Sequence, residues 1–231
     1  MAETIINPLI LAAREELNGK MKRLSRYSCQ LSGEEFKELF TLKAQQVMIE
    51  RKDRNCFVID DNNRAVLNLM YYHASRTNAD KINPLAGIVL NGKFGCGKSV
   101  LISAYCRVLN DLKFFGNETC EEIHSVELAE HIRIKGILAY TRKPLLIQDL
   151  GKEPDVVNAF GTPVNPIANL FSARVEYGAM TFGSSNFDKS MFSDFYKDKK
   201  LGITKRFVEH VNLIFLPGEN RRKDYSINQK N

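Results

Sequence analysis

Several features that mark common classes of protein are missing from this sequence. Its five cysteines include no CxxC pair, and its four histidines show no metal-ligand spacing, so no zinc site is expected. An odd number of cysteines without pairing indicates reduced thiols and a cytoplasmic location. No basic segment followed by a long apolar run marks a signal peptide, and no apolar run approaches the roughly 18 residues of a membrane span.

Strong charge bias, internal repeats and low-complexity tracts are also lacking. The 33 Lys and Arg residues exceed the 27 Asp and Glu residues by a formal charge of only +6. Such an excess fits nucleic-acid contact and an ordinary basic surface equally well. With 231 residues, of which 44% are hydrophobic, the chain can bury the core of one domain with a small appendage.

The first part of the chain predicts helices. Asn7 and Pro8 are typical of a helix start, the sequence SGEE at 32–35 fits a capping box, and a third helix is expected over 60–75. Apolar residues recur at helical spacing in these three segments: Ile10, Ala13, Leu17, Met21 and Leu24; Phe36, Phe40, Ala44 and Val47; Val66, Leu67, Met70, Tyr71 and Ala74.

From residue 83 onward, short apolar runs alternate with helical patterns. Strands are expected near 86–91, 118–123, 144–149, 178–186 and 211–218, with helices between them. Strands that alternate with helices pair in parallel through helical crossovers. The pattern therefore predicts an α/β three-layer fold with a parallel five-stranded sheet.

A glycine-rich loop follows the first of these strands. GKFGCGKS at 92–99 matches G-x-x-x-x-G-K-[ST], and it stands between an apolar strand and a helix, as the motif requires. Lys98 is expected to reach the β- and γ-phosphates of ATP, and Ser99 to coordinate Mg²⁺. The expected nucleotide-binding residues are Gly92, Lys93, Phe94, Gly95, Cys96, Gly97, Lys98, Ser99 and Val100. No NKxD-like guanine motif is present, which disfavours GTP.

A second buried strand, PLLIQDLG at 144–151, ends in an acidic residue. In a parallel sheet its carboxyl end lies near that of the first strand, beside the phosphates. Asp149 is therefore the candidate to hold Mg²⁺ through water or to orient the attacking water.

Four segments in order resemble a known family. They are GIVLNGKFGCGKSVL, PLLIQDLG, MTFGSSNF, and ITKRF followed by LPGENRR. With the entry segment FVIDDNNRAVLNLMYYHA, they resemble the AAA+ ATPases of the DnaC-type helicase loaders and the IstB-type transposition helpers. The match runs from about Phe57 to Arg222. It implies that the P-loop NTPase fold is an AAA+ base domain.

The resemblance also implies roles for individual residues. Asn186 matches the sensor-1 position, which reads the γ-phosphate; the alternative is an Asn that caps a strand–helix junction. Arg206 matches the arginine that such proteins insert into the ATP of a neighbouring subunit, which implies a homo-oligomer on ATP binding. Arg174 matches a basic position in the helix before sensor 1.

The sequence departs from the family at the second strand, where two acids usually precede Leu/Ile-Gly. Aligned on Leu-Gly, Gln148 takes the first acidic position and Asp149 the second; alternatively, Asp149 is the first and Leu150 the second. One carboxylate is missing in either alignment, and Glu153 is a nearby substitute. Gln is neutral, although its carbonyl can accept a hydrogen bond from coordinated water. We therefore expect ATP binding with slow hydrolysis.

Length gives a second departure. Few residues follow LPGENRR, so no C-terminal helical lid is expected. Residues 1–55 are expected to form a helical partner-binding region, and residues 56–231 the ATP-binding domain.

Two classes of function follow. The first is a DNA replication helicase loader or a similar DNA-associated adaptor, whose partner is a replicative helicase or a transposase-like protein. Single-stranded DNA would then contact Arg133, Lys135, Arg142 and Lys143, although these residues also fit an ordinary solvated basic face. The alternative is an ATP-binding protein-interaction scaffold that does not touch DNA.

Overall fold

Five parallel strands form the centre of the computed structural model, as the sequence predicts. Their order across the sheet is β2-β3-β6-β1-β7. Their bounds are β1 Gly87–Asn91, β2 Glu121–His124, β3 Leu145–Leu150, β6 Thr181–Ser185 and β7 Val211–Phe215. The structure describes residues 7–26, 28–53, 55–154, 157–159, 162–196, 207–208 and 210–221.

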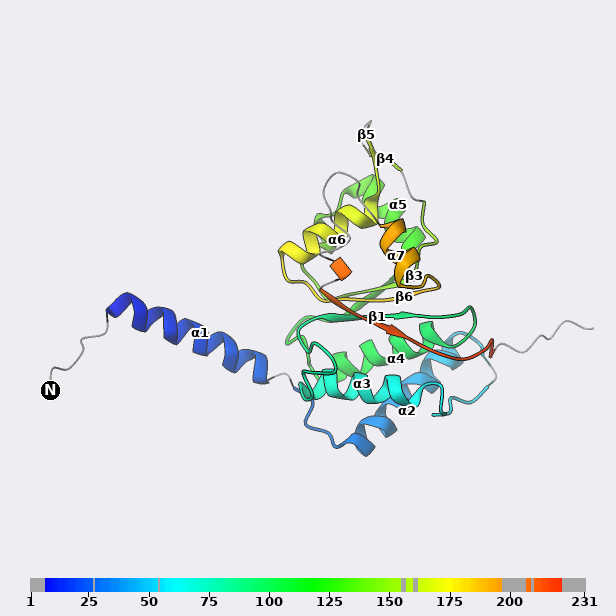
Figure 1. Ribbon diagram of the computed structural model, residues 1–231, viewed down its shortest axis with the longest axis horizontal. Coiled ribbons are helices and arrows are strands. Elements are labelled where there is room, and N and C mark those ends of the chain that lie inside the picture. Colours follow the sequence, from blue (N-terminus) through cyan, green and yellow to red (C-terminus); the bar gives the residue numbers. More distant parts are fainter. Residues whose placement is uncertain are drawn as a thin grey trace, which may run out of the picture.

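Helices cover both faces of the sheet and give three layers (Figure 1). On one face lie α2 Gly33–Glu50, α3 Arg64–Ser75 and α4 Lys98–Asp111; on the other lie α5 Ser125–Lys135, α6 Pro166–Glu176 and α7 Lys189–Phe195. The side chains of a strand alternate between faces. Ile88 and Leu90 accordingly pack against α2, α3 and α4, whereas Val89 packs in the cluster on the other face. The three-layer α/β prediction is confirmed.

Helix α2 is part of this layered body. It begins with the predicted capping box, in which Ser32 Oγ accepts a hydrogen bond from Glu35 N at 3.3 Å and Glu35 Oε2 accepts one from Ser32 N at 2.7 Å. Its predicted apolar face, Phe36, Phe40, Ala44 and Val47, is buried. The boundary between 1–55 and 56–231 stays a prediction. Helix α2 lies before this boundary in the chain and nevertheless packs in the core.

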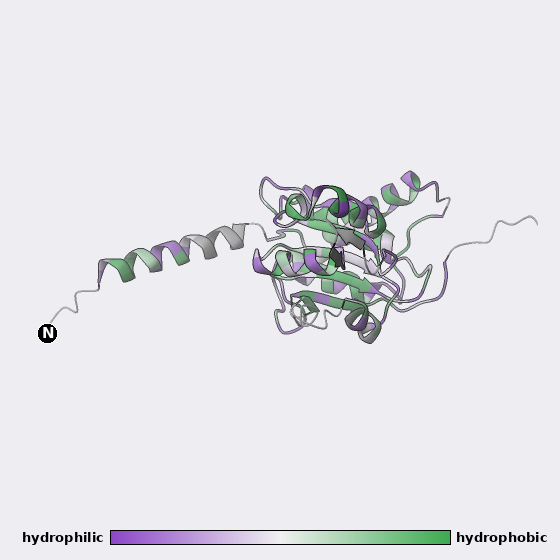
Figure 2. Ribbon diagram, turned by 90° about the horizontal axis from the view of Figure 1, so that it is seen from above, coloured by the Kyte–Doolittle hydropathy of each residue, from purple (hydrophilic) through white to green (hydrophobic). Residues whose placement is uncertain are grey.

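Helix α1, Pro8–Arg26, stands apart from the layers (Figures 1 and 2). Leu9 and Leu17 are 79% and 58% exposed, although the spacing predicts an apolar stripe on this helix. Among the described residues, no helix combines the length and the apolar composition that crossing a membrane requires.

Three details differ from the sequence prediction. Strand β2 begins at Glu121 rather than near residue 118. His73 is buried on the inner side of α3, where the prediction had Tyr71, which is only half-buried. An antiparallel pair, β4 Val157–Ala159 and β5 Thr162–Val164, was not predicted because strands this short carry no readable alternation.

His73 links α3 to the strand that leads into the glycine loop. Its Nε2 lies 2.8 Å from the Ala86 carbonyl oxygen and its Nδ1 lies 2.6 Å from the Tyr105 hydroxyl. A carbonyl only accepts, so Nε2 carries the proton in the neutral ring, and Nδ1 faces the Tyr105 hydroxyl, which also lies 3.0 Å from the Met70 carbonyl oxygen. Burial lowers the pKa of His73 to about 4, and the hydrogen bond to Ala86 only partly offsets this.

Stability should therefore fall as the pH drops from 6.5, the ordinary value, to about 4. Over that range the unfolded chain binds a proton that the folded chain excludes, at a cost of about 2–3 kcal/mol by pH 4.5. Urea unfolding at pH 7.5 and 4.5 measures the loss. The variant His73→Gln should show a smaller difference between the two pH values, and an equal difference would contradict the assignment.

Candidate nucleotide-binding site

The loop after β1 has the backbone that phosphate binding needs. Gly92, Gly95 and Gly97 all have positive φ, at 153°, 77° and 104°. A Cβ at Gly95 would come within 2.0 Å of Asn220 Oδ1, so a larger residue would have to displace that side chain and also adopt a strained positive φ. The loop leads into α4, whose N-cap Gly97 makes no side-chain capping hydrogen bond. The first amides of the helix can therefore bind an anion.

Lys98 and Ser99 stand at the start of α4, as predicted. The Lys98 amine is buried and donates to the carbonyl oxygens of Gly92 and Lys93 at 2.8 and 2.7 Å. Burial lowers the pKa of Lys98, while Cys96 and Asp149 act in the opposite direction. The Ser99 hydroxyl lies 3.5 Å from the Ser184 hydroxyl on β6. The hydroxyl that would coordinate Mg²⁺ thus faces the middle of the sheet.

The segment 216–221 wraps around the loop. Leu216 N donates to Asn91 O at 2.7 Å, and Arg221 N donates to Gly95 O at 3.1 Å. The Arg221 guanidinium forms an ion pair with Asp60 at 2.8 Å, which joins this segment to the chain that enters α3. No role was predicted for Arg221. It belongs to the motif LPGENRR, but its contact with the glycine loop is visible only in the folded chain.

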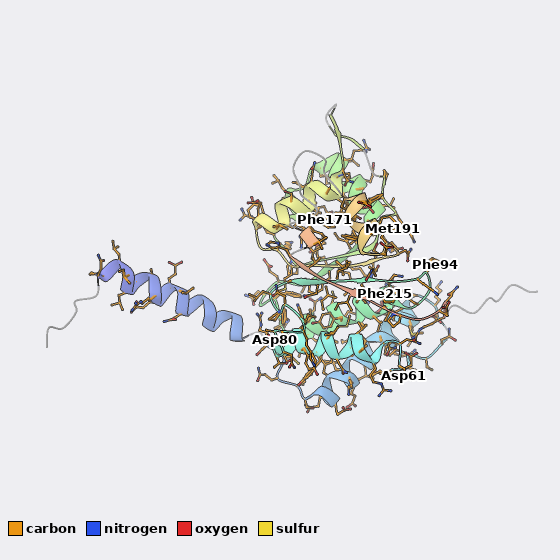
Figure 3. The ribbon with its side chains drawn as sticks, in the orientation of Figure 1. Asp61, Asp80, Phe94, Phe171, Met191 and Phe215 are labelled. Carbon is orange, nitrogen blue, oxygen red and sulfur yellow. The ribbon has the colours of Figure 1, made fainter. Side chains whose placement is uncertain are left out.

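A cleft of about 1180 Å³ opens beside the loop. Its walls come from the loop and the start of α4, the end of α2, the segment 55–58, and the residues Asp149, Lys152, Asn186 and Arg221. Phe94, labelled in Figure 3, is 54% exposed at its rim. The cleft therefore brings together Lys98, Ser99, Asp149 and Asn186 of the predicted site.

Strand β3 carries a bulge where the predicted acid stands. Ile147 pairs with Gly183 and Leu150 with Ser185, so the two residues between them oppose only Ser184. Asp149 has φ 58°, which is left-handed, and its backbone N donates to Ser184 Oγ at 3.0 Å. The bulge separates the directions of the Gln148 and Asp149 side chains.

Gln148 is fully buried beside Ser99. Its Oε1 accepts a hydrogen bond from Ser184 Oγ at 2.6 Å, and its Nε2 donates to Ser103 Oγ at 2.8 Å and to Glu122 Oε1 at 3.0 Å. Leu150 is instead buried in the apolar cluster on the other face. This arrangement favours the alignment in which Gln148 takes the first acidic position and Asp149 the second.

Asp149 lies on the cleft side of the bulge. Its carboxylate forms an ion pair with Lys152 at 2.8 Å, and the side chain of Asp149 is 28% exposed. Oxygen ligands such as this carboxylate and the Ser99 hydroxyl suit Mg²⁺. The residues present therefore fit Mg-ATP, with one carboxylate fewer than expected.

Glu153 does not supply the missing carboxylate. It is buried, and its two oxygens accept hydrogen bonds from Gly151 N at 2.9 Å and from the Tyr196 hydroxyl. Tyr196 belongs to the apolar cluster formed by α5, α6 and α7, away from Ser99. The suggestion that Glu153 substitutes in the site was wrong. Gly151, with φ 95°, turns the chain there.

Solved structures share this architecture. The crystal structure of DnaI aligns with 73% of this chain and 88% of its own, at 23% identity and a TM-score of 0.52. A candidate primosome component from Streptococcus pyogenes serotype M3 covers 72% of this chain and 85% of its own, at 19% identity and 0.52. The DnaC helicase loader covers 70% and 93%, at 16% identity and 0.51. No protein-family model and no curated protein matches the chain.

The chain shares the fold of these DnaI and DnaC structures. The resemblance inferred from the four sequence segments is thereby confirmed as a shared fold. In this fold β6 lies between β1 and β3, so Ser184 reaches both Ser99 after the loop and Gln148 at the first acidic position.

Two other arginines that the resemblance singled out, Arg174 and Arg206, are not among the described residues that line the cleft. Arg206 is not among the described residues. Arg174 is 1% exposed and donates to Thr181 Oγ1 and to the carbonyl oxygens of Met180 and Tyr140, so it is not available to a neighbouring subunit. Burial lowers its pKa to about 10.

The four predicted DNA contacts lie toward the amino ends of the strands, opposite the cleft. Arg133 pairs with Glu130 at 2.6 Å, Arg142 lies over the Tyr177 ring at 4.4 Å, and Lys143 is 3.6 Å from Glu121. Lys135 is exposed at the end of α5. Their contact with DNA stays a prediction.

Removing the partner of Glu153 should weaken the fold without touching the cleft. Tyr196→Phe leaves a buried carboxylate oxygen with one donor fewer, at a cost of roughly 1–3 kcal/mol. Urea unfolding measures the cost, with Tyr177→Phe as an exposed control. Unchanged stability would contradict this role, as would a loss of ATP affinity in the folded variant.

Proposed function

We propose that the chain is a DnaC-type AAA+ protein that binds Mg-ATP and hydrolyses it slowly. The observation that carries this proposal is the cleft in which the glycine loop, Lys98 and Ser99 face Asp149 and Asn186. Lys98 would neutralise the β- and γ-phosphates, and the amides at the start of α4 would hold their oxygens. Mg²⁺, held by Ser99 and Asp149, would balance the remaining charge.

Two features support slow hydrolysis. Gln148 is neutral where a carboxylate is usual, so the site has less negative charge with which to hold Mg²⁺ and activate water. Asp149, the remaining acid, has its Oδ2 in an ion pair with Lys152, which competes with a metal or water for that oxygen. Asn186 would read the γ-phosphate from the end of β6.

The wider role is inferred from the fold. The similar DnaC structure is named as a helicase loader, which supports a replicative helicase as the partner of this chain. Arg206 would complete the ATP site of a neighbouring copy, so ATP binding would favour a homo-oligomer. Single-stranded DNA would contact Arg133, Lys135, Arg142 and Lys143.

One observation favours the alternative, an ATP-binding protein-interaction scaffold that does not contact DNA. Helix α1 presents exposed apolar side chains that suit a protein surface. Binding to single-stranded DNA at increasing salt separates the two functions. The loader requires an affinity that falls with salt, because released counterions make phosphate contacts salt-dependent.

Nucleotide binding is tested first with Lys98→Ala. Loss of the buried amine should weaken Mg-ATP binding roughly 10- to 100-fold, which is the effect of losing charged hydrogen bonds. Calorimetric titration measures the affinity. Lys37→Ala removes an exposed helical amine that pairs with Glu34 and should leave the affinity unchanged. Equal affinities in the wild type and Lys98→Ala would refute the site.

Slow turnover is tested with the wild type. Phosphate release at saturating Mg-ATP should stay far below the roughly 10 s⁻¹ that is typical of enzymes. A rate near that value, abolished by Lys98→Ala, would show that Gln148 does not limit hydrolysis.

A further inference from the structure

A chain of polar contacts connects α2 to the nucleotide site through Gln148. At one end, Arg51, the C-cap residue of α2, donates to Ser103 Oγ at 2.9 Å and to Glu122 Oε1 at 3.0 Å. At the other end, Gln148 Oε1 accepts from Ser184, whose hydroxyl lies 3.5 Å from that of Ser99. Every contact in this chain lies on the α4 side of the sheet.

The carboxylate of Glu122 fixes the orientation of the Gln148 amide. The Glu122 Oε1 atom accepts from Arg51, Ser103 and Gln148 Nε2 at 3.0, 2.9 and 3.0 Å. An ionised carboxylate has no proton to donate, so only the NH₂ group of Gln148 can face it. The carbonyl oxygen of Gln148 must then face the Ser184 hydroxyl, which lies 3.5 Å from the Ser99 hydroxyl.

Ser103 also favours this orientation of the Gln148 amide. Its hydroxyl donates its single proton to Glu122, so it can only accept from Gln148 and from Arg51. The NH₂ group of Gln148 therefore faces acceptors only. Its two short contacts, Ser103 and Glu122, are acceptors because of the Glu122 carboxylate, and a longer contact of 3.4 Å joins it to the Ser99 carbonyl oxygen. If the amide turned over, its oxygen would face two acceptors at 2.8 and 3.0 Å, at a substantial energetic cost in a buried site.

We propose that Glu122 is a positioning residue that turns the carbonyl oxygen of Gln148, rather than its NH₂ group, toward the metal side of the site. This inference rests on the proposed function, because it concerns Mg²⁺ bound beside Ser99. An oxygen attracts a cation or accepts from its water, whereas an NH₂ group repels it. Glu122 thus supplies from β2 the carboxylate that β3 lacks, acting through the amide rather than on the metal.

The substitution Glu122→Gln tests the proposal. A neutral amide at 122 can either donate or accept, so the Gln148 amide can turn its NH₂ group toward the Ser184 hydroxyl, opposed only by the 3.4 Å contact with the Ser99 carbonyl oxygen. The Mg²⁺ concentration that half-saturates binding of a non-hydrolysable ATP analogue should rise about fivefold, as expected for loss of one hydrogen-bond acceptor. Binding of the analogue without Mg²⁺ should stay unchanged. Glu121→Gln is the matched control, since Glu121 is also exposed on this strand but pairs with Lys143 instead.

A second background distinguishes positioning from general structural support. Gln148→Glu restores a carboxylate at 148 but puts it within about the 3.0 Å that now separates Gln148 Nε2 from Glu122 Oε1, so repulsion between the two carboxylates should turn the new one away from the metal side and offset the gain in charge. Adding Glu122→Gln to this variant places the carboxylate at 148 and the amide at 122. The NH₂ group at 122 can then donate to the carboxylate at 148. The same change at 122 should therefore raise the Mg²⁺ requirement in the wild type and lower it in the Gln148→Glu background.

The outcomes separate the two proposals. A reversal of sign supports the positioning role, since a residue that only stabilises the fold would act in the same direction in both backgrounds. Equal Mg²⁺ requirements in the wild type and Glu122→Gln, or a change of the same sign in both backgrounds, would overturn the inference while the ATP site stands. If the folded wild type binds no Mg-nucleotide, both the inference and the proposed function fail.

Discussion

The hydrogen bond between Ser184 Oγ and Gln148 Oε1, 2.6 Å long, is the interaction on which the rest of the site depends. It lies at the carboxyl ends of β3 and β6 and places a fully buried neutral amide beside Ser99. A buried amide is costly unless its donors and acceptors are satisfied. Here α4, β2 and β6 each contribute a partner, through Ser103, Glu122 and Ser184. Gln148 is therefore more than a missing acid, because the surrounding residues suit an amide.

The same interaction explains why the side chains of Gln148 and Asp149 lie in different surroundings. Ser184 accepts from the backbone N of Asp149 while it donates to Gln148, and this pairing holds the bulge in β3. The bulge turns the Asp149 carboxylate toward the cleft and Lys152. The proposed function, Mg-ATP binding with slow hydrolysis, rests on this form of the site. Arg51 is a contact from α2 toward it.

Local patterns predicted the parts of the molecule that have local causes. The glycine loop, the buried strands and the capping box of α2 each follow from a short stretch of sequence. The five parallel strands and the layered α/β arrangement followed from the alternation of strand and helix patterns along the chain. The motif order added the fold of the helicase loaders, which solved structures share.

What the sequence did not predict depends on contacts between distant residues. Glu122 reaches Gln148 only because β2 and β3 are neighbours in the sheet, and Arg221 reaches the loop only because 216–221 runs beside β1. Glu153 is close to Asp149 in the chain but points to Tyr196, because the turn at Gly151 reverses its direction. Proximity in sequence was therefore a poor guide to which carboxylate serves the site.

The proposed nucleotide site is best tested by hydrogen exchange of the backbone amides, with and without Mg²⁺ and a non-hydrolysable ATP analogue. Exchange should slow at residues 92–99 and at the carboxyl end of β3, where the phosphates and the metal would bind. Unchanged exchange of residues 92–99 at saturating analogue, or protection confined to other parts of the chain, would contradict it.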